Sequence, residues 1–141
     1  MTRSELHAFL RTQKLGVLGT IGPDGAPQAA LVGIAVTEQL EILFDTVRGS
    51  RKYPNLIARP ECSFVIGGWG AREQTVQYEG DAEELKPPDL ERYREIYFET
   101  YPDGRARMNW TGITWFVVRP RWIRYSDFDQ NPPLIQEFTF G

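Results

Sequence analysis

Apolar residues recur every three or four positions in three parts of the chain, and this spacing predicts three short helices. The first helix has a capping-box pair, Thr2 and Glu5, at its start and is expected to end near Gly16. The last should end before Pro102, since a proline disfavours helix at the residue before it. The apolar faces are Leu6, Phe9 and Leu10; Tyr53, Leu56 and Ile57; and Leu90, Tyr93, Ile96 and Tyr97.

Between these helices the chain is rich in β-branched residues, and six strands are predicted. Gly22-Pro23-Asp24-Gly25 is a strong turn signal for a hairpin, and Glu38-Gln39 is short enough to return the third strand antiparallel, which makes a three-stranded meander. Glycines at 67–70 predict a second hairpin, and Pro120 suggests an edge or a bulge. The predicted strands are residues 15–21, 28–37, 40–45, 62–66, 75–85 and 114–125.

Many short antiparallel strands with little helix favour a mainly β fold, a small closed or partly closed barrel. Residues 1–141 contain no repeat and no linker, so they are interpreted as a single domain. Side chains fill a barrel of this size, so a ligand is expected outside the barrel or at an interface.

Composition narrows the possible partners. The chain is 41% hydrophobic and 25% charged, as in ordinary globular proteins. Its net charge of -3 does not favour binding to nucleic acid or to an anionic membrane. With no bilayer-length apolar run and no secretory signal, a cytoplasmic protein is expected. Cys62 and His7 are the only residues of their types, so neither a disulfide nor a Cys/His zinc site is expected.

Residues 44–52 place two hydroxyls, three cations and a glycine between a strand and a helix. Arg51 and Lys52 stand at the positive end of the helix dipole, which is unfavourable unless an anion is bound. A phosphate would accept hydrogen bonds from Thr46 and Ser50 and from both cations. The alternative interpretation, a solvated basic turn in an acidic protein, fits the residue types equally well.

This segment resembles the FMN-phosphate-binding segment of the pyridoxamine 5'-phosphate oxidase-like superfamily, the FMN-binding split barrels. Phe44-x-Thr46 followed by Ser50-Arg51-Lys52 matches the phosphate motif residue by residue. The resemblance covers roughly residues 15 to 127. Other matching motifs are Leu18-Gly19-Thr20, Gly25-Ala26-Pro27, Asn55-Leu56, Arg59-Pro60 and Gly80-Asp81-Ala82.

The resemblance implies a six-stranded antiparallel split β-barrel with short flanking helices, which forms a homodimer with one FMN in each of two symmetric clefts. Thr46, Ser50, Arg51 and Lys52 would contact the phosphate, and the partner subunit would cover the flavin ring. The ring contacts implied are Ala30, Leu31, Val32, Gln74 and Thr75. The candidates for the cover are Trp110, Trp115, Trp122 and Tyr125. Core packing remains the alternative for each aromatic residue.

Two departures separate this chain from the oxidase that gives the family its name. Ala30 and Ala35 stand where that enzyme has an arginine for FMN and a lysine for the substrate phosphate, and its C-terminal Arg-x-His element has no counterpart. Oxidation of vitamin B6 phosphates is therefore not expected. The phosphate motif does not distinguish FMN from the deazaflavin F420, whereas haem is disfavoured because His7 is the only histidine.

The leading hypothesis is an FMN-dependent oxidoreductase that takes hydride from NADH, NADPH or another donor and acts on an unknown small substrate. Alternatives are a non-enzymatic FMN-binding or electron-carrier protein, an F420-dependent reductase, and an anion-binding regulatory barrel without redox function. No catalytic side chain, metal ligand, nucleic-acid contact or membrane contact is predicted.

Overall fold

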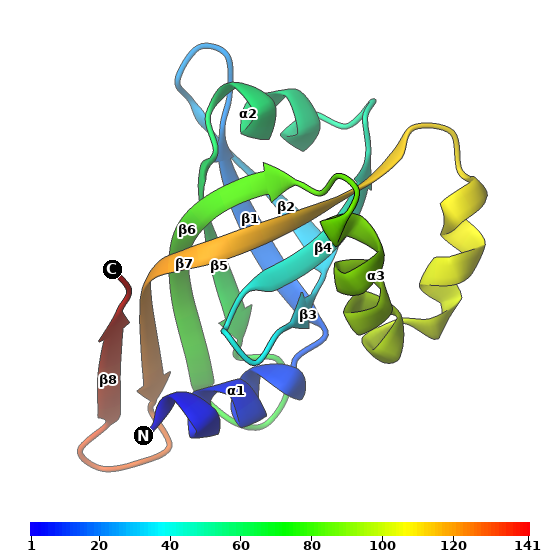
Figure 1. The fold of residues 1–141 in the computed structure, drawn as a ribbon. Helices are drawn as coiled ribbons and strands as arrows, with labels where there is room; N and C mark the ends of the chain where they lie inside the picture. The colour runs from blue at the N-terminus through cyan, green and yellow to red at the C-terminus, as the bar shows by residue number, and fades with distance from the viewer.

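Eight antiparallel strands form one sheet that curls on itself, with helices beside it and at its ends (Figure 1). The computed structural model describes residues 1–141. The strands are β1 (Leu15–Ile21), β2 (Pro27–Gly33), β3 (Ala35–Val36), β4 (Ile42–Val47), β5 (Glu61–Gly67), β6 (Gln74–Glu84), β7 (Ile113–Asp127) and β8 (Leu134–Thr139). The helices are α1 (Arg3–Arg11), α2 (Lys52–Ala58), α3 (Asp89–Thr100) and the 3-10 helix η1 (Pro102–Asn109).

The strand order shows why the sheet must curl. It runs β2-β1-β5-β6-β7-β4-β3, and β8 pairs with β7. The two ends of this order, β2 and β3, are separated in the chain by Ile34 alone. A flat sheet would hold them several strands apart, so the sheet bends round to bring its ends together. The result is the mainly β split barrel that the sequence predicts.

Both predicted hairpins are confirmed, because β1 pairs with β2 and β5 pairs with β6. The prediction of six strands was too low. The stretch 28–37 breaks at Ile34 into β2 and β3, and β3 then pairs with β4, so the meander holds only in part. Strand β8 was missed because most of its residues are exposed and two prolines precede it.

Two helical predictions also need correction. Helix α1 keeps its capping box but ends at Arg11 rather than near Gly16, because β1 already begins at Leu15. Helix η1 was missed since only Gly104 in it is buried and no apolar face marks it. The other two helices lie where their apolar spacing predicts them. No helix has both the length and the apolar character needed to cross a membrane.

The inner face of the curled sheet holds the main core, which α1 closes at one end with Leu6 and Leu10. A second, smaller core lies between the sheet and α3, where Trp115 and Val117 of β7 meet Tyr97 of the helix. Strand β7 is therefore buried on both faces through this part of its length.

The bulge suggested by Pro120 is present. Gly80 lies opposite Pro120 while Glu79 lies opposite Trp122, so Arg121 is the extra residue of β7. A Cβ atom on Gly80 would lie 2.3 Å from the backbone oxygen of Arg119. Glycine is therefore required on the strand that faces the bulge.

Candidate functional site

The residues predicted to bind the phosphate lie close together at the connection between β4 and α2. Thr46 lies in β4, and a turn closed by the hydrogen bond from Ser50 N to the oxygen of Val47 (3.0 Å) leads into the helix. The hydroxyls of Thr46 and Ser50 are 2.9 Å apart. Arg51 takes the N-cap position and makes no capping hydrogen bond through its side chain. Two hydroxyls and two cations therefore share this short segment, as predicted.

Arg51 and Lys52 have no acidic partner, since neither takes part in any of the ion pairs of the structure. Arg48, the third cation of the segment, is different: its guanidinium lies 3.3 Å from the Glu84 carboxylate. Partial burial lowers the pKa of Lys52, against the opposing charge of Asp45. An anion bound here would supply the direct ion-pair partner that Arg51 and Lys52 both lack.

A small cavity of about 110 Å³ opens beside the two cations. It is lined by Thr20, Gln28, Ala29, Ala30, Arg51 and Lys52. The methyl side chains of Ala29 and Ala30 leave this space free. The volume is well below the roughly 300 Å³ at which pockets for drug-sized ligands begin, so a tricyclic ring would have to lie outside it.

Three polar residues are hydrogen-bonded to one another beside this cavity. The sequence analysis did not assign them to the site. The buried Asn55 side chain donates hydrogen bonds to Thr20 Oγ1 (3.0 Å) and to Gln28 Oε1 (2.9 Å). These bonds fix α2 against β1 and β2. An asparagine directly before Leu56 on the buried side of a short helix was the signal available in the sequence.

The predicted ring-binding residues divide into two groups. Ala30 borders the cavity, and on the same strand Leu31 is 59% exposed while Val32 is buried. Gln74 and Thr75 begin β6, at the end of the barrel closed by α1, whereas α2 lies at the opposite end (Figure 1). Within one protomer, therefore, β6 does not bring them to the phosphate cluster.

Tyr125 belongs to the second group. It is 2% exposed, its ring packs edge-on against Phe9, and its hydroxyl accepts a hydrogen bond of 2.6 Å from Gln74 Nε2. Trp110, in contrast, is 56% exposed and lies in the turn before β7. The Arg48 amide donates to the oxygen of Gly112 in this same turn, at 2.9 Å. Trp115 is buried and Trp122 is half-buried, so Trp110 is the most exposed of the four aromatic candidates for the cover.

The residues at the β4–α2 connection fit a phosphate monoester. Two cations without acidic partners line a cavity beside two alanines, and two hydroxyls lie in the same segment of the chain; cations and hydroxyls are the groups that bind a doubly charged tetrahedral anion. The chain within one protomer does not enclose a flavin ring at this place, since the adjoining cavity is too small.

Curated relatives match most of this chain. Over 105 residues the chain is 31% identical to the pyridoxine/pyridoxamine 5'-phosphate oxidase of Thermosynechococcus vestitus, a match that covers 74% of this chain and 47% of the relative. Over 141 residues it is 28% identical to the corresponding enzyme of Burkholderia lata, covering 93% of this chain and 64% of the relative. The chain thus spans about half to two thirds of the length of these relatives.

Solved structures share the fold. A heme-binding protein from Mycobacterium smegmatis superposes with a TM-score of 0.83 at 17% identity, covering 97% of this chain and 57% of that one. A pyridoxamine 5'-phosphate oxidase-related, FMN-binding protein from Nostoc punctiforme gives 0.71 at 12% identity, covering 99% and 93%. An F420 reductase gives 0.64 at 21% identity, covering 83% and 94%. At these identities the likeness establishes the fold alone.

The family model described as pyridoxamine 5'-phosphate oxidase matches residues 2–127, which include the β4–α2 segment and nearly the whole barrel. On that match, the chain belongs to the pyridoxamine 5'-phosphate oxidase family.

Proposed function

We propose that this protein binds FMN and acts as an FMN-dependent oxidoreductase on a small molecule. The observation that carries the proposal is the pair Arg51 and Lys52, which stand without acidic partners beside the hydroxyl pair of Thr46 and Ser50. These four side chains would hold the cofactor phosphate. The related FMN-binding protein from Nostoc punctiforme, with the same fold, supports the choice of cofactor.

The space for the flavin ring implies a second protomer. The cavity beside Ala30 is too small for a flavin ring, so most of the ring would lie on the surface of the protomer, where water would reach it. We propose a homodimer in which the partner covers this ring, with Trp110 as the most exposed of the candidate aromatics. Gln74, Thr75 and Tyr125 remain predicted contacts of the flavin ring.

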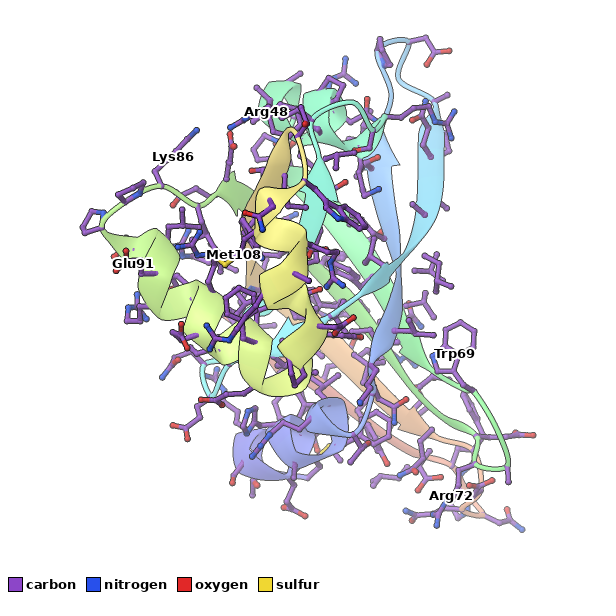
Figure 2. The ribbon with its side chains drawn as sticks, turned by 90° about the vertical axis from the view of Figure 1, so that its right-hand side faces the viewer. Arg48, Trp69, Arg72, Lys86, Glu91 and Met108 are labelled. Atoms are coloured by element: carbon purple, nitrogen blue, oxygen red, sulfur yellow. The ribbon has the colours of Figure 1, made fainter.

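The outer face of β1, β2 and β5 suits such a dimer. Val17 lies opposite Leu31 on one side and opposite Val65 on the other, so the three form an apolar stripe across neighbouring strands. Leu31 is 59% exposed and Val65 is 49% exposed. No helix covers this face, whereas α3 lies against the opposite side of the molecule, and the exposed Trp69 projects beyond the same strands (Figure 2). Contiguous exposed apolar surface of this kind favours protein association.

Bound FMN would supply two-electron chemistry by accepting and releasing hydride, which explains why no acid–base constellation is needed. The protein's contribution is then to bind the phosphate, orient the ring and exclude water from one face. A nicotinamide nucleotide is the proposed electron donor, and the substrate is a small molecule. The missing arginine and lysine at Ala30 and Ala35 oppose vitamin B6 phosphates as that substrate.

A reduction experiment separates the enzyme from the alternative flavin carrier. Protein loaded with FMN is mixed anaerobically with NADH or NADPH, and the flavin absorption band is followed over time. Bleaching at catalytic rates supports the oxidoreductase. Stable FMN binding without reduction by either donor would favour a storage or electron-carrier protein.

A titration with F420 addresses the second cofactor, since an F420 reductase shares this fold. We expect FMN to bind more tightly than F420 when each is added to the protein freed of cofactor. The opposite order would replace FMN by F420 in the proposal. A protein that binds neither would overturn the redox function and favour an anion-binding barrel.

A further inference from the structure

One carboxylate, that of Glu84, is in contact with four parts of the chain close to residues 49–52, which we call the phosphate segment. Glu84 Oε2 accepts hydrogen bonds from Thr114 Oγ1 (2.6 Å) and Arg48 Nη2 (3.3 Å). Its Oε1 accepts from the Tyr53 hydroxyl (2.9 Å) and lies 3.2 Å from Lys86 Nζ. The Glu84 side chain is only 8% exposed. The donors come from the β4–α2 connection, α2, the start of β7 and the chain after β6.

This carboxylate stays ionised at neutral pH. Burial alone would raise the pKa of Glu84, but the hydrogen bonds from Thr114, Tyr53 and Lys86 outweigh burial and lower it. Each donor is thus bonded to a charged acceptor, which makes the bonds stronger than those between neutral groups. Removal of the charge would leave the hydroxyls of the buried Thr114 and the part-buried Tyr53 poorly satisfied, whereas the exposed Arg48 and Lys86 can turn to water.

Two of these donors bracket the phosphate segment. Arg48 and Tyr53 stand immediately before and after residues 49–52, and both are tied to Glu84. The Arg48 side chain also reaches the Tyr53 hydroxyl (3.4 Å), and the Tyr53 ring packs edge-on against Phe116 in the core. Figure 2 shows Arg48 beside α2, with Lys86 nearby in the chain that leads to α3. The four residues between the two anchors include Arg51 and Lys52.

From this arrangement we infer that Glu84 is a positioning residue for phosphate binding: it holds the segment 49–52 in its binding conformation without touching the ligand. The inference rests on the proposed function. A segment fixed at both ends before binding loses less conformational entropy when the ligand arrives than a free segment does. The same geometry gives Arg48 a positioning role, because its guanidinium pairs with Glu84 and not with the phosphate.

Simple electrostatics predicts the opposite result, which makes the inference easy to test. Removal of an acid near an anion site raises the local positive potential and so favours phosphate binding. If Glu84 acts by positioning, its replacement must instead weaken the binding. In Glu84→Gln the side-chain oxygen can still accept from one pair of donors, but the amide group would face the other pair.

The experiment compares FMN with riboflavin, which lacks the phosphate, by fluorescence titration of the protein freed of cofactor. For Glu84→Gln we expect the Kd of FMN to rise about tenfold, as ordering of the segment moves into the binding step, while the Kd of riboflavin stays within about twofold. Glu83→Gln is the matched control: Glu83 is 63% exposed, pairs with Arg119 at 3.5 Å and does not contact the segment. This control should leave both affinities unchanged.

Tyr53→Phe provides a second test, because it removes one anchor and leaves the charge of Glu84 in place. It should weaken FMN binding by about threefold, again without an effect on riboflavin. The inference is overturned if Glu84→Gln binds FMN as tightly as or more tightly than the unchanged protein, or if both ligands lose affinity equally. Failure of the unchanged protein to prefer FMN over riboflavin would overturn the proposed function as well.

Discussion

Arg51 and Lys52 are adjacent in the chain and share the lack of an acidic partner, so they are best tested together. Replacement of both by alanine should weaken FMN binding by about 2 to 4 kcal/mol, since each charged hydrogen bond contributes about 1.5 to 3 kcal/mol and the two are not fully additive. Isothermal titration measures this loss. The stability of the cofactor-free protein should stay the same or rise, because two unpaired cations leave the start of α2.

The control for this pair is the double change Arg11→Ala and Lys14→Ala at the opposite end of the barrel. It removes the same charge from two exposed residues that make no ion pair with an acid. Equal loss of FMN affinity in both double variants would show that overall charge, and not the β4–α2 site, governs binding.

Cys62 is predicted to be inert in the folded protein. It is buried in β5, and burial raises the pKa of its thiol to about 12. Thiol reagents attack the thiolate, so at pH 8 the native protein should react far more slowly than the protein in urea. Ellman's reagent measures both rates. A native thiol that reacts as fast as the unfolded one would mean that β5 opens readily.

At the same scale, the proximity of the four residues predicted to hold the phosphate could be foreseen from sequence, because they are local in the chain. Thr46, Ser50, Arg51 and Lys52 lie within seven positions, so the strand-to-helix link alone brings them together. The separation of Arg48 from this cluster was not predictable, because its partner Glu84 lies 36 positions further along the chain. The Asn55 hydrogen bonds were missed for the same reason.

Among the elements, strand β7 has the most demanding geometry, because it is bulged opposite Gly80. Gly80→Ala should destabilise the protein by about 1 to 3 kcal/mol, the usual cost of overpacking, since the new Cβ would meet the Arg119 oxygen. The midpoint of urea unfolding measures the change. Gly49→Ala is the control, since a Cβ there meets nothing within 4 Å, and it should shift stability by less than about 0.5 kcal/mol. Equal midpoints for the two variants would remove the packing explanation.

The elements predicted correctly are those with an apolar period and a clear turn. The hairpin of β1 and β2 has both, and so does α3, with Tyr93 and Tyr97 buried. Strand β8 and helix η1 have neither, since most of their residues face solvent. The predicted strand 28–37 is interrupted at Ile34 for a different reason. Its two parts, β2 and β3, lie at the two ends of the strand order, and local sequence does not show which strand each part will pair with.

For the whole molecule, the decisive prediction concerns association. Leu31→Arg places a charge in the apolar stripe on the outer face, so the proposed dimer should dissociate to monomer at micromolar concentration. Sedimentation velocity measures this, and FMN binding should weaken in parallel because the cover of the ring and the predicted Leu31 contact are both lost. Ile57→Arg is the control, as Ile57 is 55% exposed and lies on α2, outside the three strands that form the stripe. A variant Leu31→Arg that stays dimeric would place the interface elsewhere.

The pairing of β4 with β7 has a consequence for synthesis on the ribosome. The β1–β2 hairpin can form as soon as residue 33 has emerged, but the long partner of β4 spans residues 113–118. Until β7 arrives, Ile42 and Leu43 have only the two-residue strand β3 beside them, and Phe44 has no paired strand at all. The nascent chain therefore exposes an unpaired apolar strand from the synthesis of residues 42–44 until residues 113–118 have been made, and the barrel closes only then.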